Sequence, residues 1–257
     1  MILAADCGNT QTVLGCIDEQ GTIVREFRIE SNRNKSHFEY ASDIDRILRL
    51  LGPEDPRFEG AILSSVVPGL TETLRKALRL LTGRDSLVVG AGIRTGLRIR
   101  IDDPGSIASD LVATAVAAKQ LFPLPAIIID MGTATTVTVV DREGSYIGGV
   151  IMPGVRISMN ALAGNTSLLP SVDLAPPRKL IATATGDAIR AGLLYGAAGA
   201  LDGILHRFEA ELDGVASIVA TGGLAASVCP YCTHPIRIDE QLLLRGLYLI
   251  WRSNRRG

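Results

Sequence analysis

The stretch Asp6-Cys7-Gly8-Asn9-Thr10-Gln11-Thr12-Val13 has a counterpart in the second half of the chain, Asp130-Met131-Gly132-Thr133-Ala134-Thr135-Thr136-Val137. The two stretches share Asp, Gly, Thr and Val at matching positions. Each follows an apolar strand pattern and continues into alternating strand residues, an Asp-x-x-Gly turn and a further strand. Because this order of strands and turns occurs twice, the sequence predicts an α/β protein built from two copies of one domain.

Strand and helix patterns alternate along the rest of the chain. We expect a long Ala-rich helix over residues 107–121 in the first half. In the second half we expect a helix over Thr185–Glu211 and a short strand over residues 234–238. We place the two domains at residues 1–114 and 115–257, so that each domain contains one of the two repeated stretches.

The two repeated stretches have the chemistry of a phosphate-binding site. An aspartate at the end of a strand can hold a cation, and a glycine turn exposes backbone N–H groups and Thr hydroxyls to phosphate oxygens. The alternative is a pair of ordinary hairpins in which Asp6 and Asp130 only form turns. We favour phosphate binding, because an Asp that ends a buried apolar strand is costly unless it is paired or bound.

Composition excludes several classes of protein. Among 257 residues, 47% are hydrophobic and the 26 basic side chains nearly balance the 27 acidic ones, so the chain is not disordered and has no overall positive field. We therefore expect a small-molecule ligand, no nucleic acid and no membrane, since no apolar stretch approaches ~20 residues. The first residues lack the pattern of a secretory signal, which together with the few cysteines favours the cytoplasm.

The segment Cys229-Pro230-Tyr231-Cys232 allows three interpretations. Its spacing is that of a dithiol redox motif, and with His234 it also resembles half of a zinc site. The third interpretation is an ordinary loop with two thiols. We favour the loop, because the pair occurs late in the chain and not at the start of a helix in an N-terminal thioredoxin-like unit.

Further motifs occur in a fixed order between and after the two stretches. These motifs are Ser64-Ser65-Val66-Val67-Pro68, Asp103-Pro104, Asp110, Tyr146-x-Gly148-Gly149, Pro153-Gly154, Thr185, Tyr195-Gly196 and Thr221-Gly222-Gly223-Leu224. Together with the two repeated stretches, they resemble the acetate and sugar kinase, actin and heat-shock chaperone superfamily, and within it the type III pantothenate kinase family.

The resemblance implies a fold, an activity and partners. It implies two duplicated ribonuclease H-like domains of the actin-like ATPase type, with ATP in the cleft between them. The implied reaction is ATP-dependent phosphorylation of pantothenate to 4'-phosphopantothenate, the first step of coenzyme A biosynthesis. Mg2+ and a monovalent cation, K+ or NH4+, are the implied ions, and a homodimer is the implied assembly.

The resemblance also implies roles for individual residues. Asp110 is the implied general base, and Thr185 joins it in the acceptor pocket. Asp6 is expected near the catalytic cation and Asp130 at the monovalent cation. The implied nucleotide-binding residues are Asp6, Gly8, Asn9, Thr10, Gln11, Thr12, Val13, Gly132, Thr133, Gly222 and Gly223.

The position of Asp110 in the first turns of a helix permits two interpretations. An aspartate there can act as a base in phosphoryl transfer, a reaction that depends mainly on positioning and neutralisation of charge. It can equally be a carboxylate that stabilises the helix start. We expect the helix dipole to lower the pKa of Asp110 and so to weaken it as a base.

The acceptor side departs from the family pattern. The family has Gly-x-Asp-Arg where this chain reads Ala108-Ser109-Asp110-Leu111, so the arginine that helps to hold the acceptor is absent. The usual aromatic residue before the Asp-Pro turn is Ile101, and basic groups are missing from Ala182-Thr183-Ala184-Thr185 and Asn165-Thr166-Ser167. Three hypotheses follow: a pantothenate kinase with unusual pocket chemistry, a kinase for another acceptor, and a nucleotide-binding paralogue with an accessory or regulatory role.

Overall fold

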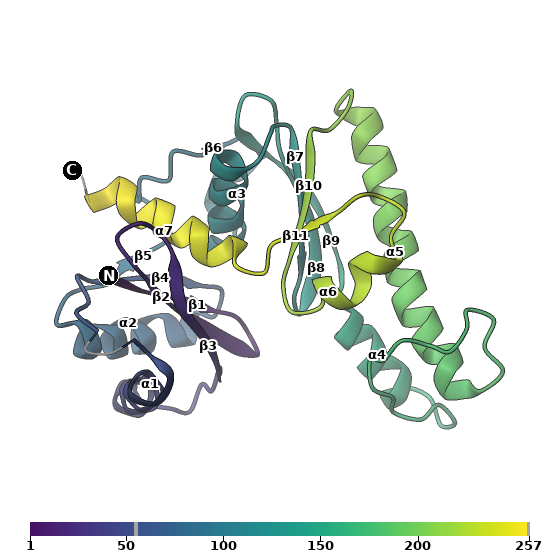
Figure 1. The fold of residues 1–257 in the computed structure, drawn as a ribbon, viewed down its shortest axis with the longest axis horizontal. Helices are drawn as coiled ribbons and strands as arrows, with labels where there is room; N and C mark the ends of the chain where they lie inside the picture. Colours follow the sequence, from purple (N-terminus) through teal and green to yellow (C-terminus); the bar gives the residue numbers. More distant parts are fainter. Residues whose placement is uncertain (54–55, 256–257) are drawn as a thin grey trace. The chain divides into compact units, whose positions relative to one another are not determined.

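The computed structural model describes residues 1–53 and 56–255. The chain divides into two compact units (Figure 1). The first unit comprises Met1–Arg98, Asp102–Gln120 and Gln241–Gly257, and the second comprises Ile99–Ile101 and Leu121–Glu240. This division differs from the predicted domains in two ways: residue 114 lies inside a helix of the first unit, and the C-terminal segment belongs to the first unit. The assignment of actin-like ATPase-type domains to 1–114 and 115–257 stays a prediction.

The first unit contains a five-stranded sheet with the order β3-β2-β1-β4-β5. Strands β1, β2 and β3 form an antiparallel meander, and β4 and β5 continue the sheet parallel to β1. The bounds are β1 Ile2–Cys7, β2 Gln11–Ile17, β3 Ile23–Glu30, β4 Ala61–Ser65 and β5 Leu87–Val88.

Helices α1 (His37–Leu51) and α2 (Pro68–Thr82) cover one face of this sheet. The hydroxyl of Ser36 accepts from the N–H of Glu39, whose carboxylate accepts from the N–H of Ser36, so α1 starts at a reciprocal cap. Helix α2 starts at a proline that needs no hydrogen bond there and ends at Gly83, whose φ of 69° suits glycine. Their buried residues form one apolar core with β1, β2 and β4.

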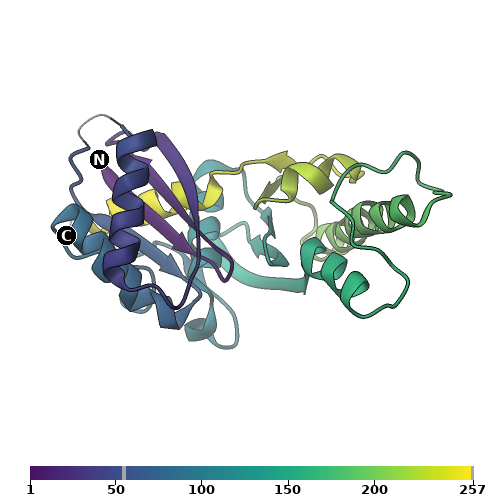
Figure 2. The ribbon, with the colours of Figure 1, turned by 90° about the horizontal axis from the view of Figure 1, so that it is seen from below.

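Helix α7 (Leu242–Arg255) covers the opposite face of the same sheet (Figure 2). It lies close to β2, because a Cβ at Gly15 would be 2.8 Å from a methyl carbon of Leu244. It also crosses α3 (Ser109–Leu121), and a side chain at Gly246 would overlap the carbonyl of Ala113. This contact explains why the C-terminal segment belongs to the first unit.

The second unit contains a six-stranded sheet with the order β11-β10-β7-β8-β9-β6. Strands β7, β8 and β9 form an antiparallel meander, and β10 and β11 continue it parallel to β7. The arrangement repeats that of the first unit, which confirms the predicted duplication. The bounds are β6 Arg98–Ile99, β7 Ala126–Met131, β8 Ala134–Val140, β9 Ser145–Pro153, β10 Ser217–Thr221 and β11 Arg237–Ile238.

Helix α5 spans Thr185–Glu211, as predicted, and packs its buried residues against β7 and β8. Within the described residues it is the one helix long and apolar enough to cross a membrane. That property alone is weak support for a membrane span, because a core helix has the same length and composition. The unit also contains α4 (Val155–Gly164), α6 (Ala225–Val228) and a short 3-10 helix, η2 (Cys229–Tyr231).

Two predicted elements are shorter than expected. The strand predicted over residues 234–238 is reduced to Arg237–Ile238, because the N–H groups of Thr233 and His234 donate to the carboxylate of Asp202 and not to a neighbouring strand. The helix predicted from residue 107 begins at Ser109, after the 3-10 helix η1 (Pro104–Ser106) and an extended residue, Ile107.

Candidate functional site

The turn between β1 and β2 holds the first predicted nucleotide-binding stretch. Gly8 donates its N–H to the carbonyl oxygen of Gln11 at 3.0 Å, and a Cβ at Gly8 would lie 3.1 Å from that same oxygen. The turn is therefore tightly closed, and Asn9 and Thr10 are exposed at its tip. Turns of this kind offer backbone N–H groups and short polar side chains to phosphate oxygens.

Thr12 and Asp6 lie on either side of this turn. Thr12 is buried and its hydroxyl lies 2.9 Å from that of Ser31, so its side chain faces the interior of the unit. Asp6 is half-buried on β1, in register with Ser64 on β4 and Val13 on β2. The structure thus places the carboxylate of Asp6 near the end of β1 and β4, and the nucleotide-binding roles stay predictions.

Asp110 is the second residue of α3, and the start of this helix is joined to the end of β4. The buried hydroxyl of Ser109 accepts from the N–H of Ser65 at 2.9 Å and lies 3.0 Å from the hydroxyl of Ser64. Because Ser64 is in register with Asp6, the first unit brings Asp6 and Asp110 to the same edge of its sheet. The segment Ser64-Ser65 was one of the motifs of the resemblance, but its contact with Ser109 did not follow from spacing.

Burial raises the pKa of the Asp110 carboxyl, although the N–H of Leu111 donates to its Oδ1 at 2.7 Å and acts in the opposite direction. The expectation that the helix dipole would lower this pKa is therefore wrong in sign, because the loss of water outweighs the backbone donors. A carboxylate whose pKa is raised is a stronger base. The geometry thus supports the base interpretation while keeping the helix-start hydrogen bond.

The turn between β7 and β8 holds the second predicted stretch. Asp130 is in register with Thr221 at the end of β10, where the Thr-Gly-Gly motif begins. Gly222 has a φ of +89°, and a Cβ there would lie 2.7 Å from Oδ1 of Asp130 and 2.7 Å from the backbone of Met131. The second unit therefore brings Asp130 and Gly222 into contact, and their roles at a common site stay predictions.

A second glycine supports the same turn from β9. A side chain at Gly154 would overlap the carbonyl of Thr133 and lie 2.8 Å from that of Gly132. The Pro153-Gly154 motif therefore packs directly beneath the exposed residues Gly132 and Thr133. Close backbone packing of this kind restricts the conformation of the turn.

Thr185 is the exposed first residue of α5 in the second unit. Charged residues surround the start of this helix: Arg190 forms ion pairs with Asp173 and Asp187, the latter at 3.2 Å. Arg178, 91% exposed, lies 3.8 Å from Asp187. Thr185 thus lies beside a region that contains basic groups, and its role in an acceptor pocket stays a prediction.

The two strand-end aspartates suit oxygen-seeking cations. Mg2+ is usually held by one or two carboxylates together with substrate phosphates, and K+ also prefers oxygen ligands. Among residues 1–53 and 56–255, no group of three or more His, Cys, Asp or Glu side chains could hold a metal ion by itself. The donor set therefore fits a cation shared with nucleotide phosphates at Asp6 or Asp130, and does not fit an all-protein metal cage.

The substituted positions have apolar surroundings. Leu111 is half-buried on α3, and in the part of the chain that the structure describes Asp110 contacts no cation. Ile101 lies 3.7 Å from the position of a Cβ at Gly148 on β9. Neither position supplies a substitute for the basic side chain or the aromatic ring of the family pattern.

The four thiols are free and protonated at neutral pH. Burial raises the pKa of Cys229 to about 11 and that of Cys232 to about 12. Cys7 and Cys16 are buried, and burial raises both of their pKa values. Because a reactive cysteine requires a thiolate, these raised pKa values favour the loop interpretation of the pair 229 and 232 over the redox one.

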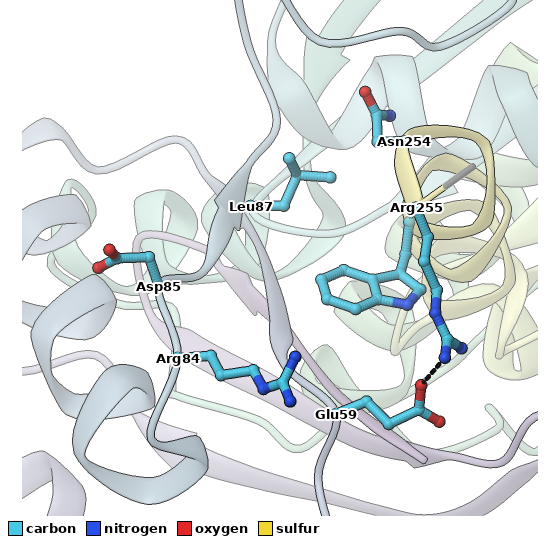
Figure 3. A pocket seen from close by; sticks show the side chains of 7 residues that line it. Glu59, Arg84, Asp85, Leu87, Asn254 and Arg255 are labelled. Carbon is cyan, nitrogen blue, oxygen red and sulfur yellow. Dashed lines mark ion pairs between the residues drawn. The ribbon is translucent and has the colours of Figure 1, made fainter. Parts of the chain in front are cut away.

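A cavity of about 510 Å3 lies elsewhere in the first unit, between α7 and the edge where β4 and β5 begin (Figure 3). The ion pair of Glu59 and Arg255 forms part of its wall, and Arg84 extends into it from the segment before β5. Asp6 and Ser64 lie near the opposite end of these strands. The cavity contains none of the predicted site residues and is not the phosphate-binding site.

Comparison with solved structures defines the fold class. The chain is similar to a Campylobacter jejuni protein assigned to the Baf family, with 17% identity, a TM-score of 0.61 and coverage of 100% of both chains. It is also similar to the Clostridium difficile activator of 2-hydroxyisocaproyl-CoA dehydratase with bound ADPNP, with 13% identity, a TM-score of 0.57 and coverage of 99% and 96%. The duplicated sheets and these neighbours define the fold as two duplicated ribonuclease H-like domains.

Comparison with sequences gives the family. The model of the type III pantothenate kinase family matches residues 2–207. Type III pantothenate kinases of Moorella thermoacetica and Geotalea uraniireducens are 37% and 39% identical to this chain, over 99% of it and 100% and 99% of their own lengths. The chain belongs to the type III pantothenate kinase family. Nothing in these comparisons favours the accessory-paralogue hypothesis.

Proposed function

We propose that this protein transfers the γ-phosphoryl group of ATP to the primary hydroxyl of pantothenate. The family match over residues 2–207 is the observation that carries the proposal. The products are ADP and 4'-phosphopantothenate, so the reaction is the first step of coenzyme A biosynthesis. The predicted site residues lie on turns and helix starts of both units, where exposed backbone N–H groups can bind phosphate.

Asp110 is the proposed general base. The hydroxyl oxygen of pantothenate forms a bond to the γ-phosphorus, the bond from that phosphorus to the bridging oxygen breaks, and ADP leaves. The hydroxyl proton moves to the carboxylate of Asp110. The raised pKa of this carboxyl supports the role, because a carboxylate with a higher pKa accepts a proton more readily. The half-buried position also limits competing water.

Asp6 is the proposed protein ligand for Mg2+, and Asp130 for K+ or NH4+. Bound cations neutralise charge on the phosphates. The support is the position of each carboxylate at a strand end beside a glycine turn, together with the oxygen chemistry that both ions prefer. Asn9, Thr10, Gln11 and Thr133 are the proposed side chains closest to nucleotide, because they are exposed on the two turns.

A second copy of this chain is the proposed partner. Along the exposed side of α5, Gly192, Gly196 and Gly199 have no atom within 4 Å of the position of a Cβ. The second unit also exposes large apolar side chains near this helix and elsewhere, among them Tyr195, Ile151 at 75% and Ile181 at 86%. Uncovered apolar residues and small residues that allow close approach are typical of an interface between identical subunits.

A cytoplasmic location follows from the same proposal, since free thiols and a small-molecule substrate are typical of cytoplasmic enzymes.

Release of ADP tests the proposed function. Purified protein with ATP, Mg2+ and K+ is titrated with pantothenate, and release is compared with that in the absence of an acceptor. We expect release that depends on pantothenate and saturates. Binding of ATP without pantothenate-dependent release contradicts the proposal, and a screen of other hydroxyl-bearing acceptors then separates a kinase with a different acceptor from a nucleotide-binding paralogue.

A further inference from the structure

The hydroxyl of Ser109 uses its full hydrogen-bonding capacity. It donates to the carbonyl oxygen of Ser65 at 3.1 Å, accepts from the N–H of Ser65 at 2.9 Å, and lies 3.0 Å from the hydroxyl of Ser64, which can donate to it. A serine hydroxyl has one hydrogen and two lone pairs, so these three contacts leave none unused. Both serine hydroxyls are buried, with Ser64 at 0% exposure, and so have no access to water as a substitute.

These contacts connect α3 to one defined point of the sheet. Val112 donates its N–H to the carbonyl of Ala108 at 3.1 Å, so α3 begins immediately beside Ser109. Ala108 has no side-chain oxygen, and the hydroxyl of Ser109 is directed to β4 instead of capping the helix. Oδ1 of Asp110 accepts from the N–H of Leu111 in the first turn of α3, and the attachment of Ser109 to β4 fixes the position of that turn.

The same point of the sheet is next to Asp6. Ser64 and Asp6 are partners in the parallel pairing of β4 with β1, and partners on neighbouring strands present their side chains to the same face. Asp110 follows Ser109 directly in the chain. Asp6 is therefore connected to Asp110 in two steps. The first is its pairing with Ser64 on β4, and the second is the contact between the hydroxyls of Ser64 and Ser109, the residue before Asp110.

We propose that Ser109 is a positioning residue: through Ser64 and the Ser65 backbone, its hydroxyl fixes the carboxylate of Asp110 relative to Asp6. The inference rests on the proposed roles of Asp110 as base and Asp6 as cation ligand. In phosphoryl transfer, misplacement of a group by about 1 Å can cost a factor of about 100 in rate, so a fixed helix start has a direct kinetic effect. Thr71 supports the arrangement from the far side, by donating its hydroxyl to that of Ser65 at 2.8 Å.

The test compares Ser109→Ala with Ser109→Thr, which keeps a hydroxyl. We expect Ser109→Ala to lower kcat about 10-fold or more, with the KM for ATP unchanged, and Ser109→Thr to recover most of kcat. The acidic limb of the pH profile of kcat should also move to lower pH in Ser109→Ala, since a looser helix start admits water to Asp110. A residue with a purely structural role does not move this limb.

Ser64→Ala removes the hydroxyl contact between Ser64 and Ser109 without changing Ser109. It tests the inference if Ser109→Ala does not fold. The double variant should lose little more kcat than Ser109→Ala alone, because Ser109→Ala already removes the hydroxyl contact that Ser64→Ala removes. Ser86→Ala is the matched control, since the hydroxyl of Ser86 is buried in the same unit without a hydrogen-bond partner among the described residues. Its kcat should equal that of the unmodified protein.

Folded Ser109→Ala or Ser64→Ala protein with unchanged kcat and pH profile overturns the inference. Additive losses in the double variant overturn it as well. Asp110→Asn separates this result from failure of the proposed function. If Asp110→Asn retains turnover, the base assignment itself is wrong; if it abolishes turnover while Ser109→Ala has no effect, only the positioning role is wrong.

Discussion

Oδ1 of Asp130 lies 2.7 Å from the position that a Cβ on Gly222 would occupy. The two residues come from different elements, since Asp130 is near the end of β7 and Gly222 follows β10. Register explains the contact, because Thr221 is the direct partner of Asp130 in the parallel pairing of these strands. A carboxylate and a glycine turn are thus held together by the sheet itself.

Gly222→Ala should destabilise the protein and weaken binding of ATP. The φ of +89° is unfavourable for alanine by about 1–2 kcal/mol, and the added methyl group would also displace Asp130 or the backbone of Met131. Gly214→Ala is the control, because Gly214 has a similar φ of +95° but nothing within 4 Å. Urea unfolding and nucleotide titration of both variants measure the difference. Equal losses in the two variants would show that contact with Asp130 has no part in the effect.

Stability should depend on pH through His234. Its Nδ1 lies 2.7 Å from Oδ1 of Asp202 and its Nε2 lies 3.4 Å from Glu209, and these carboxylates raise the pKa of His234 despite partial burial. The protonated form is therefore favoured in the folded state. Its contribution is complete below the unfolded pKa of about 6.5 and is lost as the pH rises through the higher folded pKa.

The measurement is the free energy of unfolding of His234→Gln at about pH 6 and about pH 9. The variant should be less stable than the unmodified protein mainly at the lower pH. Hydrogen bonds from His234 and Thr233 lower the pKa of Asp202 in spite of burial, so the contribution of Asp202 is lost only as the pH falls further, outside this range. His206→Gln, at an exposed position on α5, the helix that carries Asp202 and Glu209, should show no such change. A deficit independent of pH in His234→Gln argues against the ion pairs.

Alkylation should leave phosphoryl transfer intact. Burial raises the pKa of Cys229 to about 11 and of Cys232 to about 12, so almost no thiolate is present at neutral pH. We expect iodoacetamide at about pH 7.5 to label the folded protein slowly and to leave ADP release unchanged. Mass spectrometry of the labelled protein identifies the sites. Rapid labelling of either cysteine with parallel loss of activity would restore the redox or metal-binding hypothesis.

Gly196→Glu should convert a dimer to a monomer. A side chain at this exposed position on α5 meets no atom of its own chain within 4 Å, so the change introduces charge on the surface without an internal clash. Gly69→Glu on α2 is the matched control, since Gly69 is also a helical glycine with nothing within 4 Å. Sedimentation velocity gives the mass of each variant. A monomeric unmodified protein, or a Gly196→Glu variant that remains dimeric, contradicts the proposed interface.

The duplication was predictable from the sequence because each copy has a strong local pattern. An apolar strand, a glycine turn and alternating residues follow Asp6 and Asp130 alike, and local patterns of this kind determine hairpins. The bounds of α5 were predictable for another local reason, since Thr185–Glu211 is rich in Ala and Leu and contains no proline. The association of α7 with the first unit was not, because it depends on tight packing at Gly15 and Gly246 over long separations in sequence.

The chemistry of Asp110 was predictable only in part. Its place at a helix start was visible in the sequence, and the helix dipole alone gave the wrong direction for its pKa. Burial reverses that direction, and burial arises from tertiary packing that spacing does not reveal. The contact of Ser109 with Ser64 was likewise hidden, because the two residues are far apart in the chain and meet only through the sheet.

Pantothenate-dependent release of ADP, measured side by side for the unmodified protein and Asp110→Asn, tests the central claim most directly. The account predicts saturable release by the unmodified protein with Mg2+ and K+ present. In Asp110→Asn it predicts a kcat lower by a factor of about 100 or more, with ATP binding nearly unchanged. ATP binding without pantothenate-dependent release by the unmodified protein, or full turnover by Asp110→Asn, would contradict it.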